Sequence, residues 1–179
     1  MPWLVAGLVL VTGCSEEKDY SKVVDAVLVA QDQIHQAVLA DPATWTVPVM
    51  EGVDIAGTLE GVGSVDVSGW RQDKEETAGS GFYRVFGEKL FLTFNNYAAL
   101  DVTLSGLLVA TTHSIDFGKT DAAFEDLNQT NSYVGILTVG GALPGSFQLD
   151  VNGITTNNTQ WTCGTINGEP YGGGHCYEH

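Results

Sequence analysis

The sequence predicts a mainly β protein in which one N-terminal amphipathic helix packs on a large, curved antiparallel sheet. Apolar residues recur at helical spacing in one long stretch, between about residues 20 and 41. After Trp45 the apolar residues instead alternate with polar ones, which is typical of strands that have one dry and one wet face. Turn-forming pairs such as Asn167-Gly168 recur at hairpin spacing through the same region.

The helix is predicted to begin near Tyr20 and to end near Asp41-Pro42, because the residue before a proline is pushed out of the helical region. Polar residues such as Gln31 lie largely off its apolar stripe. A single amphipathic helix cannot bury that stripe alone, so it must lie on the dry face of the sheet. The stripe consists of Tyr20, Val23, Val24, Val27, Ala30, Ile34, Ala37 and Val38.

The alternating segments after Trp45 predict about eight to ten strands. We expect an open or half-open curved sheet, because one helix of this length covers one dry face; a closed barrel and a sandwich are the alternatives. Two stretches break the alternation: 72–81 is predicted as a charged, glycine-ended loop, and 116–131 as an acidic, polar segment with a short helix. The turn signals are Glu60-Gly61, Gly87-Glu88, Asn95-Asn96, Leu143-Pro144-Gly145, Asn152-Gly153 and Asn167-Gly168.

Residues 1–13 carry no charge, are mostly apolar, and are followed at once by a charged segment. The apolar run is too short for a membrane span, which needs about 20 residues, but it suits the apolar core of an export signal. It ends in Val11-Thr12-Gly13-Cys14, which resembles the lipobox of bacterial lipoproteins. An alternative interpretation is a buried N-terminal strand or helix in which Cys14 is incidental.

The resemblance to lipoproteins implies that a peptidase cuts before Cys14, which then carries acyl chains such as palmitate on its sulfur and its new amino group. Residues 1–13 would be the removed signal peptide, 14–19 a lipidated tether, and 20–179 a single domain. Each buried acyl methylene contributes about 0.8 kcal/mol, and more than one chain gives stable anchoring. In that family a Ser after the lipidated Cys, here Ser15, goes with sorting to the outer rather than the inner membrane.

The chain is strongly acidic, with 22 Asp and Glu against 7 Lys and Arg and a formal net charge of −15. Such a charge repels phosphate backbones, so we expect no nucleic-acid partner. It also repels anionic lipid heads. The acyl chains, rather than the domain surface, are therefore expected to hold the protein at a membrane.

The cysteine count fits an exported protein. Once Cys14 is set aside, Cys163 and Cys176 remain as an even pair, which we interpret as a disulfide. Closing a loop of this size would stabilise the fold by about 3 kcal/mol, because it lowers the entropy of the unfolded chain. A zinc site is the weaker alternative, because structural sites usually pair their ligands closely as C-x₂₋₄-C. Its ligands would be Cys163, His175, Cys176 and His179.

The sequence carries no known catalytic motif: it lacks G-x-S-x-G, H-E-x-x-H, a phosphate loop and a dinucleotide fingerprint. We therefore expect a non-catalytic protein without a cofactor. Glu75-Glu76 is a paired carboxylate by sequence, but neighbours in a charged segment usually face water.

A sugar-stacking platform is the weaker interpretation of aromatic residues that most β proteins use as core. Those aromatics are Trp45, Trp70, Phe82, Tyr83, Phe91, Tyr97, Tyr133 and Trp161.

Three functions are compatible with these observations. The first is an exported, lipid-anchored envelope or surface protein that scaffolds the envelope or binds a partner protein. The second is a carrier on the periplasmic side that holds a small apolar ligand in the concavity of the sheet. The third is a sugar-binding or hydrolytic protein whose site would unite His113, an acidic residue and a hydroxyl.

Overall fold

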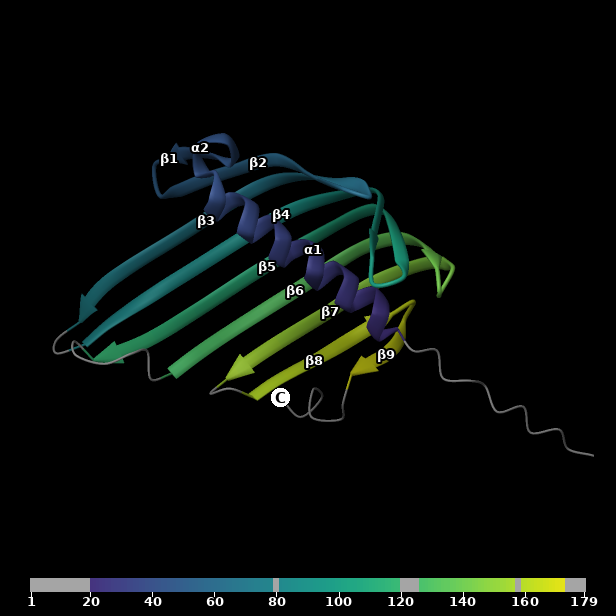
Figure 1. Cartoon of the computed structure of the whole chain (residues 1–179). Coiled ribbons are helices and arrows are strands. Elements are labelled where there is room, and N and C mark those ends of the chain that lie inside the picture. The colour runs from purple at the N-terminus through teal and green to yellow at the C-terminus, as the bar shows by residue number, and fades with distance from the viewer. Residues whose placement is uncertain (1–19, 79–80, 120–125, 157–158, 173–179) are drawn as a thin grey trace, which may run out of the picture.

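A computed structural model describes residues 20–78, 81–119, 126–156 and 159–172 of the chain. Within these ranges two helices precede nine strands (Figure 1). The helices are α1 (Ser21–Ala40) and α2 (Pro42–Trp45), and the strands are β1 (Thr46–Val49), β2 (Gly52–Gly61), β3 (Gly63–Ala78), β4 (Gly81–Ala99), β5 (Val102–Lys119), β6 (Asp126–Gly141), β7 (Gly145–Thr156), β8 (Thr159–Ile166) and β9 (Glu169–Gly172).

The nine strands form one sheet in sequence order, and each strand is antiparallel to the next. The first and last strands, β1 and β9, are its two edges, so the sheet is open. The predicted open antiparallel sheet with one long N-terminal helix is therefore confirmed. Both edge strands are four residues long and contain a proline, Pro48 or Pro170, which blunts the edges against pairing with another chain.

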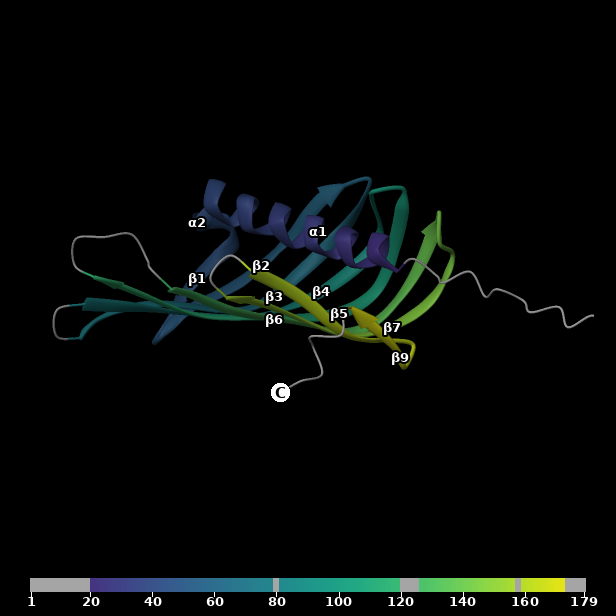
Figure 2. The same ribbon diagram turned by 90° about the horizontal axis from the view of Figure 1, so that it is seen from below.

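The sheet curves around α1, which crosses the strands diagonally on the concave face (Figures 1 and 2). The helix ends at Ala40, before Asp41-Pro42, as the proline predicts. Asp41 then caps the short helix α2, its side chain accepting a hydrogen bond from the Thr44 backbone N–H at 3.3 Å. The turn of α2 places Trp45 against β2, where a Cβ on Gly57 would lie 2.6 Å from the indole ring.

The core lies between α1 and the concave face. It joins the helical stripe to the inward residues of the long strands, and most of these side chains are fully buried. The helix contributes Val23, Val24, Ala26, Val27, Ala30, Ile34 and Val38, and the central strands contribute Val65, Val67, Leu90, Leu92, Phe94, Leu104, Leu108, Leu137, Leu149 and Val151.

The two stretches predicted to break the strand pattern are largely strand, so the loop predicted at 72–81 is wrong, as is the break predicted at 116–131. β3 runs on to Ala78 and β4 starts at Gly81, while β5 reaches Lys119 and β6 starts at Asp126. On β3, Asp73, Lys74 and Glu75 are all exposed, so no dry face imposes an alternation there. The backbone ladder with β4 holds these residues in a strand all the same. Residues 79–80 and 120–125 lie outside the described parts of the chain.

Three of the six turn signals mark turns, at residues 61–63, 142–145 and 167–168. The other three are wrong. Gly87-Glu88 lies within β4 and Asn152-Gly153 within β7, while Asn95-Asn96 lies at an irregularity in the pairing of β4 with β5. At that irregularity Asn96 has φ +52°, a left-handed conformation that Asn adopts more readily than most residues.

Residues 1–19 and 173–179 lie outside the described parts, so the predicted signal peptide and tether, Cys14, His175, Cys176 and His179 are not placed. Among the helices that are described, none combines the length and apolar character needed to cross a bilayer.

Candidate functional site

A buried polar cluster links α1 to the sheet. The carboxylate of Glu88, on β4, lies between His35 of α1 and Arg71 of β3, and only 1% of its side chain is exposed. His35 Nε2 lies 2.8 Å from Glu88 Oε1, and Arg71 Nε lies 2.8 Å from Glu88 Oε2. The guanidinium carbon of Arg71 also lies 5.6 Å from the centre of the Phe86 ring. Because an ionised carboxylate only accepts hydrogen bonds, both partners are donors.

The two partners keep Glu88 ionised inside the fold. Burial raises the pKa of the Glu88 carboxyl, but the hydrogen bond from His35 and the charges of His35 and Arg71 oppose burial and bring this pKa below its usual range. Both carboxylate oxygens are engaged by these partners. The carboxylate is therefore placed to fix the helix on the sheet, not to take a proton from a substrate.

A second link lies one helical turn earlier. Tyr133, on β6, donates a hydrogen bond from its hydroxyl to Gln31 Oε1 at 2.7 Å, and Gln31 Nε2 donates to Thr112 Oγ1 at 3.4 Å. Burial, and the negative charge of Glu88, raise the pKa of the Tyr133 hydroxyl to about 12. Gln31 is 6% exposed, so the prediction that it lies off the buried stripe is wrong. Its amide is buried because both of its polar ends find partners on the sheet.

The opposite flank of α1 is tied by a third contact. The Tyr97 hydroxyl donates to Gln33 Oε1 at 2.7 Å. Together the three contacts hold both flanks of the helix while its apolar stripe fills the space between them. The concave face under α1 is thus occupied by the protein's own side chains.

The convex face of the sheet, which α1 does not cover, carries an apolar patch on its three central strands. Phe91 of β4 is paired with Val109 of β5, and Val109 is paired with Val134 of β6. One row along, Leu107 is paired with Ile136. The side chains are substantially exposed: Phe91 42%, Leu107 52%, Val134 47% and Ile136 60%. We call these five residues the convex patch. Contiguous exposed apolar surface of this kind marks interaction sites.

The polar setting of the convex patch is defined by its neighbours on the same face. Lys89 Nζ lies 5.5 Å from the centre of the Phe91 ring, a cation–π arrangement at one side of the patch. Asp150 is paired with Val134 on the other side and is exposed. An apolar centre with charged groups around it resembles the anatomy of protein–protein interfaces.

Among the residues that the structure describes, His113 and the predicted aromatics do not assemble into one hydrolytic or sugar-binding site. His113 is exposed on the convex face, paired with Gly87 and Thr130, and no acidic residue is its pairing partner. Among the aromatics, Tyr97 and Tyr133 are buried on the concave side, whereas Phe91 is exposed on the convex side. They cannot form one stacking platform, and the side chains of Phe82, Tyr83 and Trp161 lie outside the description.

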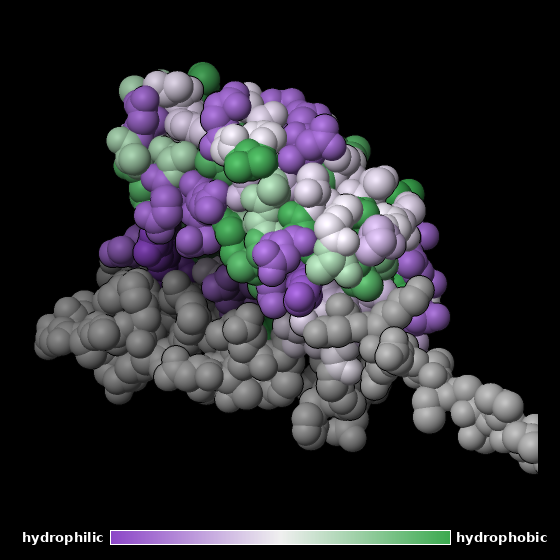
Figure 3. All heavy atoms as spheres, turned by 45° about the vertical axis from the view of Figure 1, so that its right-hand side comes forward, coloured by the Kyte–Doolittle hydropathy of each residue, from purple (hydrophilic) through white to green (hydrophobic). Residues whose placement is uncertain are grey.

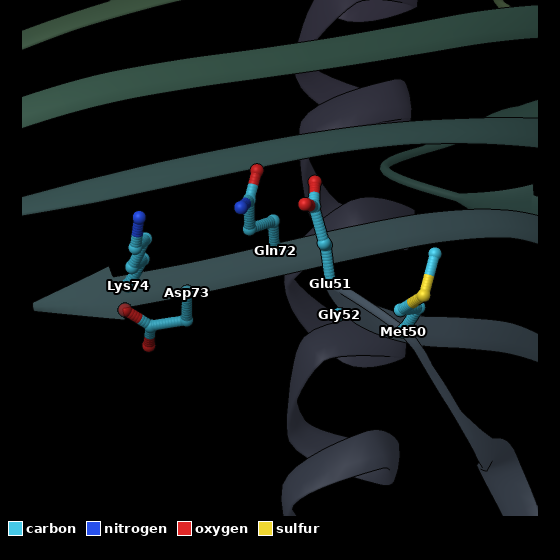
Figure 4. Close-up of a pocket in the computed structure, with 6 residues that line it drawn as sticks. All are labelled: Met50, Glu51, Gly52, Gln72, Asp73 and Lys74. Carbon is cyan, nitrogen blue, oxygen red and sulfur yellow. The ribbon is translucent and has the colours of Figure 1, made fainter.

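An open depression of about 350 Å³ lies where β2 begins and β3 runs on past it (Figure 4). Its residues come from the β1–β2 turn, from the first residue of β2 and from β3, whose alternate side chains point in different directions (Figure 4). Asp73 is already bound by the Arg84 guanidinium, whose Nε lies 2.6 Å from Asp73 Oδ1. The hydrogen bond from Arg84 lowers the pKa of the Asp73 carboxyl. The lining residues are Met50, Glu51, Gly52, Gln72, Asp73 and Lys74.

Of the predicted cysteine pair, the structure places only Cys163. It lies on β8, opposite Asn152 of β7 and Gly172 of β9, and is 8% exposed. Its pairing with Cys176 stays a prediction, as does the lipidation of Cys14. In the described part of the chain no three His, Cys, Asp or Glu side chains converge to hold a metal ion.

No protein-family model matches the chain, and searches of curated proteins and of solved structures also find no match.

Sequence reasoning did not find Glu88 or the convex patch. Glu88 follows a glycine and so suggested a turn, and His35 had no partner that could be identified from the sequence. For the patch a signal was present, because Val134 and Ile136 are apolar at the positions that alternate with the buried Tyr133 and Leu137. Apolar residues on both faces of one strand indicate a sheet with two dry faces.

Proposed function

We propose that the protein is a non-catalytic, lipid-anchored envelope protein that binds a partner protein through the convex patch. The observation that carries this proposal is the exposed apolar surface on β4, β5 and β6, at the centre of a face that α1 leaves open. The anchor is supported by the lipobox-like Val11-Thr12-Gly13-Cys14 at the end of an apolar leader.

The size of the convex patch supports a protein partner. Full burial of one large apolar side chain contributes roughly 1.5 to 3 kcal/mol. Phe91, Leu107, Val134 and Ile136 are each about half exposed, so covering them would contribute roughly 3 to 6 kcal/mol. That gain, with hydrogen bonds at the polar edge of the patch, suits a transient protein interface better than a small ligand on a flat surface.

The anchor is tested by metabolic labelling with an alkyne fatty acid, comparing the wild type with Cys14→Ala. We expect label and membrane sedimentation in the wild type only, and a mature wild-type mass that corresponds to residues 14–179 plus acyl chains. A mature chain that still begins at Met1 with an unmodified thiol would contradict the proposed anchor.

The partner-binding role is tested with a photo-crosslinking amino acid placed at Leu107 in the native cell. The matched control places it at His113, which is exposed on the same face of β5 but lies six residues from Leu107 and outside the patch. We expect one discrete crosslinked protein from position 107, lost when Ile136→Ser is added, and a much weaker product from position 113. Equal products from both positions, or a product that is insensitive to Ile136→Ser, would mean that the convex patch is not a docking surface.

A further inference from the structure

The start of α1 is fixed to one end of the sheet. Tyr20 donates a hydrogen bond from its hydroxyl to Glu169 Oε2 at 3.2 Å, and its ring packs edge-to-face on Phe147 with ring centres 5.8 Å apart. Phe147 is near the start of β7 and Glu169 is the first residue of β9. Residue 20 therefore sits beside the β6–β7 and β8–β9 turns.

In a sheet whose strands follow one another in order, alternate turns lie at the same end. The β2–β3, β4–β5, β6–β7 and β8–β9 turns share the end at which α1 begins, on the right in Figure 1. We call this end the tether rim. It consists of the turns at residues 61–63, 99–102, 141–145 and 166–169.

The segment between the predicted lipidation site and the fold is short. Five residues, 15–19, separate Cys14 from Tyr20, so six Cα steps of at most about 3.6 Å allow a reach of about 20 Å. The long strands span far more, since the 18 residues of β5 at about 3.3 Å each give about 60 Å. An acylated Cys14 would therefore keep the tether rim, and not the opposite end of the sheet, close to the bilayer.

Two turns of the tether rim expose apolar side chains at their tips. Val62 is 75% exposed and Leu100 is 52% exposed, although hairpin turns ordinarily carry Gly, Asn or Asp. The two turns are tied together, because the Ala98 N–H donates to the Val62 carbonyl at 2.8 Å. Figure 3 brings this side of the molecule forward and shows apolar residues among polar ones on its surface.

Leu100 is held in an unfavourable conformation. Its φ of +48°, followed by +67° at Asp101, places a bulky side chain in the left-handed region that favours glycine or asparagine. The Leu100 side chain is half exposed, so packing in the core does not account for it. Strain kept in an exposed turn is a reason to look for a functional contact.

The opposite end of the sheet has a different character. On β3 and β4, the residues that extend beyond the polar cluster include exposed Asp73, Lys74 and Glu75 and half-buried Arg84. The far end also exposes Met50 in the β1–β2 turn, so exposed apolar side chains are not confined to the tether rim. The rim differs in the left-handed backbone of Leu100 and in its place beside Tyr20, where the tether begins.

From the tether length and the two apolar tips, we infer that the tether rim lies on the membrane surface and that Val62 and Leu100 enter the interfacial layer of the lipid. This inference rests on the proposed acylation of Cys14. The contact is apolar rather than electrostatic, because a net charge of −15 repels anionic lipid heads. Zwitterionic phosphatidylcholine is therefore the appropriate probe.

The test uses the acylated mature chain in vesicles of phosphatidylcholine brominated on its acyl chains, which quench nearby tryptophan. The variants are Val62→Trp, Leu100→Trp and, as the matched control, Met50→Trp, each read against the parent to subtract its native tryptophans. Met50 is 99% exposed but lies in the β1–β2 turn, away from the tether rim. We expect the added tryptophan at 62 or 100 to be quenched at least twofold more than the one at 50.

A second measurement needs no substitution at the rim. Amide hydrogen exchange in residues 61–63 and 99–102 should slow at least threefold in the vesicle-bound chain relative to soluble Cys14→Ala, while residues 50–52 stay unchanged.

The intact mass distinguishes failure of the membrane contact from failure of the proposed acylation of Cys14. Acylated protein with equal quenching at 62, 100 and 50 and unchanged exchange at the rim would overturn the membrane contact alone. A mature chain without acyl groups would overturn the proposed anchor, and the membrane contact with it.

Discussion

Replacing Glu88 by glutamine removes the charge at the centre of the polar cluster while keeping the shape of the side chain. The glutamine amide keeps one acceptor oxygen, so either Arg71 or His35 then faces an NH₂ group in place of its acceptor, and the Arg71 guanidinium loses its counter-charge. Because Glu88 joins β3, β4 and α1, we expect the substitution to loosen the helix on the sheet and to lower the free energy of unfolding.

The magnitude follows from burial. Removing one partner of a buried ion pair typically costs about 3–5 kcal/mol. The side chains of Arg71 and His35 are 16% and 31% exposed, so water can partly replace the lost carboxylate. We therefore expect a loss of about 2 to 3 kcal/mol, which is about 30- to 150-fold in the unfolding equilibrium. In urea the midpoint should fall by about 1 to 1.5 M for an m-value near 2 kcal/mol/M.

The assay is urea unfolding followed by circular dichroism at several pH values. The folded-state pKa of Glu88 lies below its ordinary value of about 4.5, so the stabilisation is present above that pH and is lost as the pH falls through the lowered pKa. The difference between wild type and Glu88→Gln should therefore shrink in acid, as the pH falls through the lowered pKa of Glu88.

Two controls test whether the effect comes from the buried charge of Glu88. Glu75→Gln removes an exposed carboxylate on the neighbouring strand and should change stability by less than about 0.5 kcal/mol. The pair Arg71→Met with Glu88→Leu leaves neither of these charges buried, so it should recover much of the loss. If Glu88→Gln is as stable as the wild type at pH 7, the cluster does not hold the helix.

Three further predictions concern other parts of the fold. Burial raises the pKa of Tyr133 from its usual 10.0 to about 12, so roughly 3 kcal/mol of stability is present below pH 10 and is lost as the pH rises from 10 to 12. Urea unfolding of Tyr133→Phe should show a smaller alkaline loss, and an equal loss would contradict the shift. If Cys163 and Cys176 form a disulfide, the mass of the exported protein should rise by two hydrogens on reduction, and an unchanged mass would refute the pairing. Cys176→Ser should then lower the free energy of unfolding by about 3 kcal/mol. Gly57→Ala places a Cβ 2.6 Å from the Trp45 ring, so thermal unfolding should show a free energy of unfolding about 1 to 3 kcal/mol lower than that of the wild type. An unchanged free energy would mean that the ring is not packed tightly against β2.

The parts of the fold that sequence predicted are those in which burial imposes a period. The stripe from Val23 to Val38 repeats with the helical period because it faces the sheet, and Leu90 and Leu92 alternate because they face α1. Pro42 supplied the end of the helix through a local steric rule that needs no tertiary information. These signals are local, so one sequence is enough to find them.

The missed parts lack such a period or depend on distant partners. At Asp73, Lys74 and Glu75 both faces of β3 are exposed to water. The strand is held there by backbone pairing with β4, and such pairing leaves no periodic pattern in the side chains. Glu88 and His35 are 53 residues apart, and only the diagonal course of α1 brings them together. A buried ion pair of this kind cannot be read from local sequence.

The energetics of α1 also decide which surface is available to a partner. Val23, Val24, Val27, Ile34 and Val38 are each at most 4% exposed, and full burial of such side chains contributes roughly 1.5 to 3 kcal/mol apiece, or roughly 8 to 15 kcal/mol together. A protein of this size has a total stability of about 5 to 15 kcal/mol. Lifting the helix to admit an apolar ligand would therefore cost about as much as unfolding, even before the contacts of Gln31, Gln33 and His35 are broken. The convex patch needs no such opening, because its side chains already face outward, and this difference in cost favours partner binding over ligand carriage.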